Sequence, residues 1–163
     1  MPDIANSPLP KPDFSVPPLA CDVHFHVFGP AEKYPYGSDL RYKPPLAPLD
    51  DFLKLANQLG MQRFVFVQPS AYGEDNTCML DAMAIMGEQC RGVVDISENT
   101  PEHDLQKLHD LGVRAIRINV SPIKPYEAGF ADQLIGPIKR KADLAKDMAG
   151  TFNSYRPAGW FKS

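Results

Sequence analysis

Two histidines separated by a single residue, His24 and His26, are the first side chains along the chain whose type and spacing could perform chemistry. The residues around them predict a β-strand over residues 20–27. Because successive side chains of a strand point to opposite faces, Asp22 is expected to point the same way as both histidines. Two imidazoles one strand step apart can bind a divalent metal such as Zn²⁺ or polarise a substrate carbonyl. The alternative is that one histidine hydrogen-bonds within the fold and the other is solvated.

Arg117 is the second candidate, because it interrupts an apolar strand expected over residues 113–120. Alternation along this strand places Arg117 on the face opposite Ile116 and Ile118. A guanidinium at the carboxyl end of a strand can hold a carboxylate through two parallel hydrogen bonds. The alternative for Arg117 is a structural ion pair.

The remaining histidines and the cysteines are weaker candidates. His103 and His109 stand among charged residues of a predicted helix and are expected to be solvated. The cysteines Cys21, Cys78 and Cys90 fit neither a disulfide framework nor a CxxC zinc site, which favours a reducing cytoplasm. Cys21 faces away from the histidine pair by alternation, so a nucleophilic role is not expected for it.

These side chains need a scaffold to position them, and the periodicity of the sequence predicts one from residue 20 onward. Strands are expected over residues 20–27, 63–68, 92–96 and 113–120. Helices are expected over residues 49–59, 76–86, from Thr100-Pro101-Glu102 to Gly112, and over about 130–148 with an interruption at Gly136-Pro137. This alternation predicts an α/β fold with a parallel sheet. Four βα units are half of a (β/α)8 barrel, and a small open doubly wound sheet is the alternative that periodicity leaves open.

Two proline-rich stretches flank the first strand. Residues 1–19 are expected to form an extended arm outside the domain, which we place at residues 20–148. Residues 30–48 form a connection much longer than an ordinary βα loop, and long ordered loops tend to be functional.

Composition excludes several classes of function. The net charge of −3 over 163 residues offers no basic surface, so nucleic acid is not expected as a partner. No apolar stretch approaches the ~20 residues that cross a bilayer, and the amino end lacks the pattern of a secretory signal. A single cytoplasmic domain is therefore expected.

Several further motifs fall at the ends of predicted strands. With the histidine pair they form the set Cys21-Asp22-Val23-His24-Phe25-His26-Val27-Phe28-Gly29-Pro30, Tyr34-Pro35-Tyr36, Arg41-Tyr42-Lys43-Pro44, Val67-Gln68-Pro69-Ser70 and Gly112-Val113-Arg114-Ala115-Ile116-Arg117-Ile118-Asn119. Over about residues 20–126 this set resembles the amidohydrolase superfamily, and within it the 2-pyrone-4,6-dicarboxylate lactonase branch. The resemblance implies that the domain is the N-terminal half of a (β/α)8 TIM barrel.

The resemblance also implies a hydrolase that acts on a carboxylate-bearing lactone or a related cyclic ester or amide. His24 and His26 match the pair that polarises the lactone carbonyl in that branch and binds metal elsewhere in the superfamily. The implied cofactor is therefore a divalent metal such as Zn²⁺, or none. Tyr42, Ser70 and Arg117 match positions that hold the carboxylates of the substrate.

The carboxyl-terminal part of the chain departs from the family pattern. The lactonases carry a further arginine after the fourth strand where this chain has Lys124, so a related lactone or acid is as well supported as the pyrone dicarboxylate. Residues 149–163 lose the periodic pattern and are expected to be irregular. We interpret them as out of frame after the loss of one base near codon 149, with a genuine short paralogue as the alternative. The family's general base, an aspartate on strand 8, has no counterpart, so the chain is expected to be weakly active or inactive.

Open strand edges of a half barrel favour a homo-oligomer. Two other functions also fit the same residues: a non-catalytic scaffold that binds an anionic ligand with Arg117 and the histidine pair, and a small metal-binding α/β protein with unrelated chemistry. Lactone turnover that is lost in His24→Ala supports the hydrolase. Carboxylate binding without turnover supports the scaffold, and stoichiometric zinc without either supports the metal-binding protein.

Overall fold

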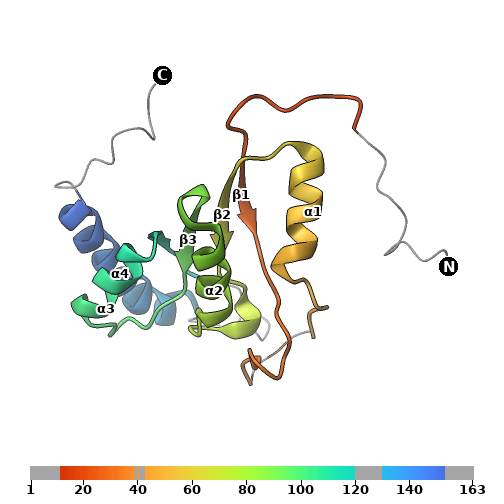
Figure 1. Ribbon diagram of the computed structural model, residues 1–163. Coiled ribbons are helices and arrows are strands. Elements are labelled where there is room, and N and C mark those ends of the chain that lie inside the picture. The colour runs from red at the N-terminus through yellow and green to blue at the C-terminus, as the bar shows by residue number, and fades with distance from the viewer. Residues whose placement is uncertain (1–11, 39, 41–42, 120–129, 153–163) are drawn as a thin grey trace.

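The computed structural model describes residues 12–38, 40, 43–119 and 130–152 of the chain. Within this part, one parallel sheet contains the strands β1 (Cys21–Phe25), β2 (Arg63–Val67), β3 (Cys90–Val94) and β4 (Val113–Ile116). The strands lie side by side in the order of the sequence, as Figure 1 shows. The expected α/β class with a parallel sheet is confirmed, and every strand ends earlier than its periodicity predicts.

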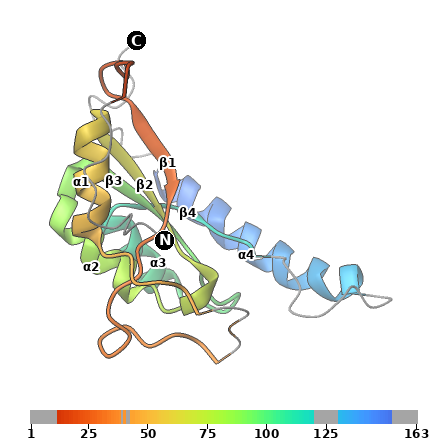
Figure 2. The same cartoon turned by 90° about the vertical axis from the view of Figure 1, so that its right-hand side faces the viewer.

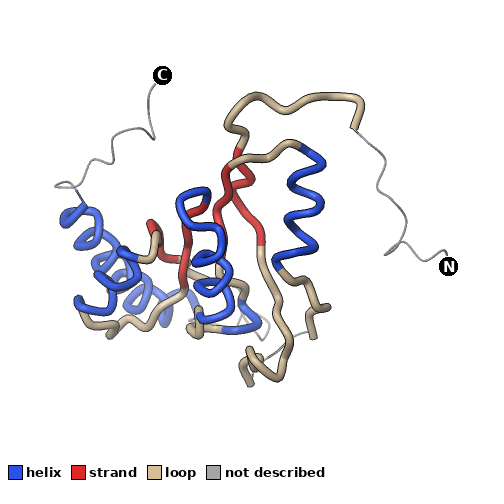
Figure 3. Tube along the Cα trace, in the orientation of Figure 1, coloured by secondary structure: helices blue, strands red, loops and turns tan. Residues whose placement is uncertain are grey.

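Helices alternate with these strands: α1 (Leu49–Leu59), α2 (Thr77–Met86), α3 (Glu102–Asp110) and α4 (Phe130–Phe152), with short 3-10 turns η2 (Ser70–Tyr72) and η3 (Gly87–Gln89) on either side of α2. The alternation can be followed along the trace in Figure 3. In Figure 2, α1 and α2 lie on one side of the strands, and α4 extends on the other side from the β4 edge. None of the described helices combines the length and apolarity needed to cross a bilayer.

An aromatic cluster determines how α1 packs on the sheet. Phe52 of α1 stacks on Phe25 of β1, with ring centroids 3.8 Å apart and an interplanar angle of 5°. Phe64 and Phe66 of β2 are 3% and 0% exposed and complete the cluster. Burial of each phenylalanine side chain stabilises the fold by roughly 1.5–3 kcal/mol. Because Phe25 is held against α1, the side chains that flank it on β1 must point away from that helix.

The start of α3 differs from the prediction. The sequence Thr100-Pro101-Glu102 predicts a helix that is capped by Thr100 and has Pro101 as its first residue. The helix instead begins at Glu102, and Pro101 takes the N-cap position with a ψ of 149°. The Thr100 hydroxyl donates to the backbone carbonyl of Ser97 at 2.8 Å. The hydroxyl therefore closes a local turn, as serine and threonine side chains commonly do, and does not cap the helix.

The last helix also differs from the prediction. We expected Gly136-Pro137 to interrupt it, but Pro137 lies inside a continuous α4. A proline in a helix interior costs about 3 kcal/mol, and helical turns on both sides and packing against α3 and β4 can offset that cost. The helix also continues to Phe152, past Met148, where an irregular segment was expected to begin. Residues 153–163 lie outside the described part of the chain.

The long connection after β1 folds back on the neighbouring loop. Phe28 and Ala47 exchange two backbone hydrogen bonds of 2.9 Å each, which hold the two ends of the connection together. Further along, the Gly37 N–H donates to the carbonyl of Ala71 at 2.8 Å. The connection therefore lies against η2, which follows β2, and its described residues are ordered by backbone contacts.

Candidate active site

The histidine pair lies on the face of the sheet that α1 leaves open. His24 and His26 come directly before and after Phe25, the last residue of β1, and Phe25 is buried against α1. His24 is exposed and His26 is half-buried. Their ring centroids are 5.2 Å apart, and the rings meet edge to face at an interplanar angle of 79°. Two imidazoles are thus side by side and accessible from one direction.

Asp22 does not join the histidines in the way that strict alternation predicts. The pairing of β1 with β2 is irregular, because Asp22 lies opposite Phe64 while Phe25 lies opposite Phe66. A bulge of this kind adds one residue to a strand and interrupts its alternation. The carboxylate Oδ1 of Asp22 accepts a hydrogen bond of 3.0 Å from the backbone N–H of His24. Asp22 therefore stabilises the shape of the strand that presents His24.

The tautomer of His26 follows from its hydrogen-bond partner. Its Nδ1 lies 2.7 Å from the backbone carbonyl of Val67. A carbonyl can only accept, so the proton must be on Nδ1, and Nε2 of the neutral ring carries a lone pair. Burial is the main cause that lowers the pKa of His26 below 6.5, and the charge of Arg117 acts in the same direction. At neutral pH, His26 is therefore an acceptor or a metal ligand through Nε2.

Arg117 follows β4 and reaches across the sheet toward β2. Its Nη1 donates to the backbone carbonyl of Gln68 at 2.6 Å, and its backbone N–H donates to the carbonyl of Val94 at 2.6 Å. No carboxylate of the described residues forms an ion pair with Arg117, so the structural ion pair considered above is not found there. A guanidinium has five N–H donors, so one bond to a carbonyl leaves it able to hold a carboxylate.

Two consecutive carbonyls at the carboxyl end of β2 bring the site together. The carbonyl of Val67 holds His26, which comes from the β1 side, and the carbonyl of Gln68 holds Arg117, which comes from the β4 side. Ser70 begins η2 just beyond them and is exposed. Of the residues predicted from the sequence, this edge of the sheet therefore gathers the two histidines, the serine and the arginine.

Two predicted residues cannot be placed. Tyr42, expected to hold a substrate carboxylate, and Lys124, at the position where the lactonases carry an arginine, both lie outside the described residues. Their roles remain predictions.

Gln68 is the residue that the sequence analysis missed, although it lies within a quoted motif. It is 1% exposed, and Asn76 at 9% is the other buried polar residue in the described part of the chain. The signal was present in the sequence, because a glutamine that ends the apolar run Phe64-Val65-Phe66-Val67 can be buried only if its amide is hydrogen-bonded.

The metal-binding prediction can be tested against the donor set. His26 has the arrangement of a metal-binding histidine, with Nδ1–H on a carbonyl and Nε2 directed elsewhere. A catalytic zinc site, however, requires three protein ligands. Among the described residues, no group of three or more histidine, cysteine, aspartate or glutamate side chains is arranged to hold a metal ion. The described residues therefore do not form a complete metal site.

The other sequence candidates lie elsewhere. Cys78 and Cys90 are buried, as expected, and burial raises the pKa of the Cys90 thiol to about 11. Burial also raises the pKa of Cys21, which suits a structural thiol. His103 is exposed as predicted, whereas His109 is half-buried and its Nδ1 accepts a hydrogen bond of 3.0 Å from an arginine guanidinium. The expectation that His109 is solvated is therefore wrong in part.

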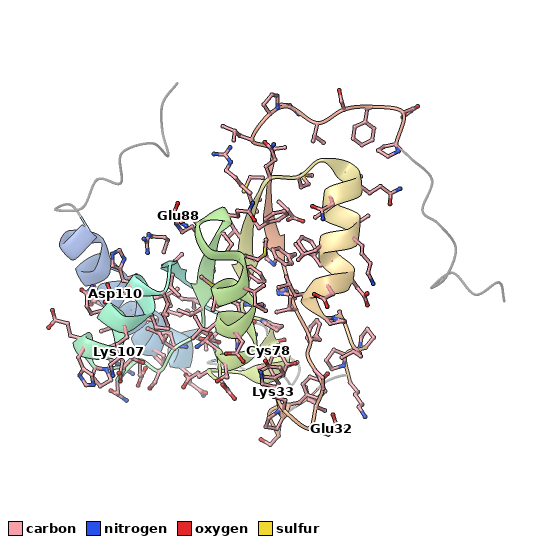
Figure 4. The ribbon with its side chains drawn as sticks, viewed as in Figure 1. Glu32, Lys33, Cys78, Glu88, Lys107 and Asp110 are labelled. Atoms are coloured by element: carbon pink, nitrogen blue, oxygen red, sulfur yellow. The ribbon has the colours of Figure 1, made fainter. Side chains whose placement is uncertain are left out.

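Two cavities of the molecule lie apart from the histidine pair. One, of about 640 Å³, lies between the segment around Phe14 and the end of α1 near Gly60. The other, of about 340 Å³, lies beside α2, where Lys33 and Cys78 are close together in Figure 4. At its rim, Asp81 accepts hydrogen bonds from Lys33 at 2.9 Å and from the Tyr34 hydroxyl at 2.7 Å. These three side chains hydrogen-bond to one another. The open sheet face with the histidine pair is therefore a better candidate for the active site than either cavity.

Comparison with known proteins gives the relatives of this chain. Over 109 residues it is 39% identical to a 2-pyrone-4,6-dicarboxylate hydrolase of Comamonas testosteroni and 36% identical to a 4-sulfomuconolactone hydrolase of Hydrogenophaga intermedia. Each match covers 67% of this chain and 36% of the relative, so the chain spans about a third of the length of these curated proteins.

A solved structure shares the fold. The apo crystal structure of an Agrobacterium tumefaciens protein superposes with a TM-score of 0.69 at 28% identity, covering 83% of this chain and 47% of that one. A family model described as amidohydrolase matches residues 21–132, a span that contains both histidines, Ser70 and Arg117. Because this match covers more than half of the chain, the chain belongs to the amidohydrolase family.

Proposed function

We propose that this chain is a hydrolase of the amidohydrolase type, with a site for a carboxylate-bearing lactone or a related cyclic ester or amide. The observation that carries the proposal is the convergence of His26 and Arg117 on the consecutive carbonyls of Val67 and Gln68. The names of the curated relatives support the substrate class. We further propose that the four βα units are the first four of a (β/α)8 barrel, in which active sites lie at this end of the strands.

Each polar group of the site has a distinct part in the proposed reaction. Arg117 holds a carboxylate of the substrate through its guanidinium, and the Ser70 hydroxyl donates to the same group. His24, the exposed imidazole, donates an N–H to the lactone carbonyl and stabilises the negative charge that develops on its oxygen. His26 offers its Nε2 lone pair to the attacking water and takes up the proton that the water loses. It returns this proton to the ring oxygen when the lactone C–O bond breaks, so that the product is the ring-opened acid.

Turnover by these residues alone is expected to be slow. Among the described residues, no carboxylate side chain hydrogen-bonds to either imidazole of the pair, so none stabilises the charge that His26 gains with a proton. A well-aligned acid–base system typically contributes ~10²–10⁴ in rate. This observation favours a second candidate function, which is binding of an anionic ligand without turnover. Both candidates require the same carboxylate site.

Ligand binding by the purified chain tests the proposal. Isothermal titration with 2-pyrone-4,6-dicarboxylate is expected to show binding that Arg117→Lys weakens at least tenfold, because lysine cannot form the two-pronged hydrogen bonds of arginine. The matched control is Arg114→Lys, which changes an exposed arginine of β4 and is expected to leave affinity within twofold. Equal affinities of the two variants would refute the carboxylate site. Release of the ring-opened acid then separates the hydrolase from the binding protein.

We also propose that open strand edges let the chain associate with itself. In the described sheet β1 and β4 each have one strand neighbour, and Val23 on β1 is 68% exposed. An exposed edge with an apolar side chain favours pairing with another chain.

A further inference from the structure

We infer that Gln68 is a positioning residue that fixes the Ser70 loop and Arg117 in the arrangement that receives a carboxylate; this rests on the function proposed above. Gln68 ends the buried run of β2 and is 1% exposed. Its effect on a ligand would pass through two other groups, the turn that carries Ser70 and the guanidinium of Arg117.

The side-chain amide holds the loop that follows β2. Nε2 donates to the backbone carbonyl of Gly73 at 3.0 Å and to that of Asp75 at 2.8 Å. These carbonyls lie on the turn that leads from η2, with Ser70 as its first residue, into α2. Both N–H groups of the Gln68 amide thus donate to carbonyls of one turn. The turn cannot move away from β2 without breaking both bonds.

The main chain of the same residue fixes Arg117. The Gln68 carbonyl accepts the 2.6 Å bond from Nη1, and the Gln68 N–H donates to the carbonyl of Val93 on β3 at 2.8 Å. The bond to β3 holds the Val67–Gln68 peptide in the sheet, directly before the Gln68 carbonyl that meets Arg117. One residue therefore sets the relative position of the serine and the guanidinium.

The remaining atom shows that the amide is not present for packing alone. Gln68 Oε1 is buried without a hydrogen-bond partner among the described residues. An unpaired buried acceptor is unfavourable, and an apolar side chain would fill the same space without it. Turning the amide over would set Oε1 against two carbonyls. The observed orientation therefore satisfies the turn and leaves Oε1 unpaired.

A second buried amide, that of Asn76, ties the same turn to the residue that follows β3. Asn76 donates from Nδ2 to the carbonyl of Asp95 at 2.8 Å, and its Oδ1 accepts from the Asp95 N–H at 3.2 Å. Asp95 follows β3, so the far end of the turn is tied to the next strand. Both buried polar residues of the described chain are thus used to hold residues 70–76.

The test compares Gln68→Leu with two controls. Gln106→Leu makes the same change at an exposed glutamine on α3, whose Nε2 donates to Asp110 at 2.8 Å. Val113→Ala weakens the core at the amino end of β4, where Val113 is 0% exposed. Titration with 2-pyrone-4,6-dicarboxylate is expected to show at least a tenfold rise in Kd for Gln68→Leu only. Backbone hydrogen exchange over residues 70–76 is expected to accelerate at least tenfold in that variant alone.

The outcomes separate the two proposals. If wild type binds and Gln68→Leu keeps its Kd within twofold, or if exchange in residues 70–76 is unchanged, Gln68 does not position the site. If Val113→Ala weakens binding as much, the effect is loss of stability and the inference fails. If wild type does not bind, the carboxylate site fails, while the exchange comparison still decides whether Gln68 holds the loop. Should Gln68→Leu not fold, the side-chain amide protons of Gln68 in wild type must exchange at least tenfold more slowly than those of Gln106, and equal rates would overturn the inference.

Discussion

His26 shows how one backbone contact decides what a histidine can do. Two histidines on a strand are compatible with binding metal, donating to a carbonyl or accepting a proton. The bond from Nδ1 to the carbonyl of Val67 removes the choice for His26, since only Nε2 remains and it carries the lone pair in the neutral ring. The donor role then passes to His24. The different roles of the two histidines, acceptor for His26 and donor for His24, therefore depend on a contact with β2 and cannot be predicted from the motif alone.

The pKa of His26 gives a prediction at this scale. Burial holds it below 6.5, so in an NMR titration the His26 ring is expected to change charge at a lower pH than a free imidazole, with Nδ1 protonated at neutral pH. A midpoint at or above 6.5 would contradict the account. Because the unfolded chain takes up this proton more readily, the stability contributed by neutral His26 is lost as the pH falls from about 6.5 toward the folded pKa. Urea unfolding at several pH values measures that loss, and His26→Gln should reduce it.

Some residues of the site could be predicted and others could not. His24, His26 and Arg117 carry imidazole or guanidinium groups at strand ends, and residue type with position is enough to single them out. The alternation that groups Asp22 with the histidines is interrupted by an irregular pairing with β2, which a single strand pattern does not contain. The direction of the Gln68 amide depends in the same way on where the turn at residues 73–75 comes to lie.

Among the helices and strands, the spacing of apolar residues predicts the bounds well where hydrophobic burial determines the structure. The bounds of α1 were predicted as observed, because its apolar spacing and Gly60, with a φ of 77°, are local signals. The proline in α4 misled the prediction, since a residue that disfavours a helix does not outweigh the turns on either side of it. The predicted strands end too late along the chain, because apolar residues continue past the observed strand ends into the loops that form the site.

The packing of α1 leads to a prediction about stability. Phe52→Ala removes the ring that stacks on Phe25 at 3.8 Å and should lower the free energy of unfolding by about 2–4 kcal/mol. The control is Leu55→Ala on the same helix, where the side chain is 41% exposed and the loss should stay within about 1 kcal/mol. Urea unfolding of both variants measures the difference. Similar losses would mean that the aromatic cluster does not hold α1 to the sheet.

At the scale of the whole molecule, the sheet has open edges and one open face. The described strands form an unclosed sheet, and the apolar Val23 lies on the edge strand β1. Light scattering after gel filtration is expected to show species heavier than the 18.1 kDa chain. Val23→Lys should shift them toward the monomer, because a charge on an edge strand opposes pairing. The control Ile85→Lys alters an apolar residue of α2 that is 75% exposed and should leave the mass distribution unchanged. A chain that is monomeric at every concentration contradicts this proposal.

The open face at the carboxyl edge of the sheet is proposed to bind a carboxylate. The most direct measurement is NMR mapping of 2-pyrone-4,6-dicarboxylate on the isotope-labelled chain. The account predicts shifts of the Arg117 guanidinium, the imidazoles of His24 and His26, and the Ser70 amide, all saturating with one affinity. Shifts confined to the cavity beside Lys33 or to the one beside Phe14, with the Arg117 signals unmoved, would contradict it.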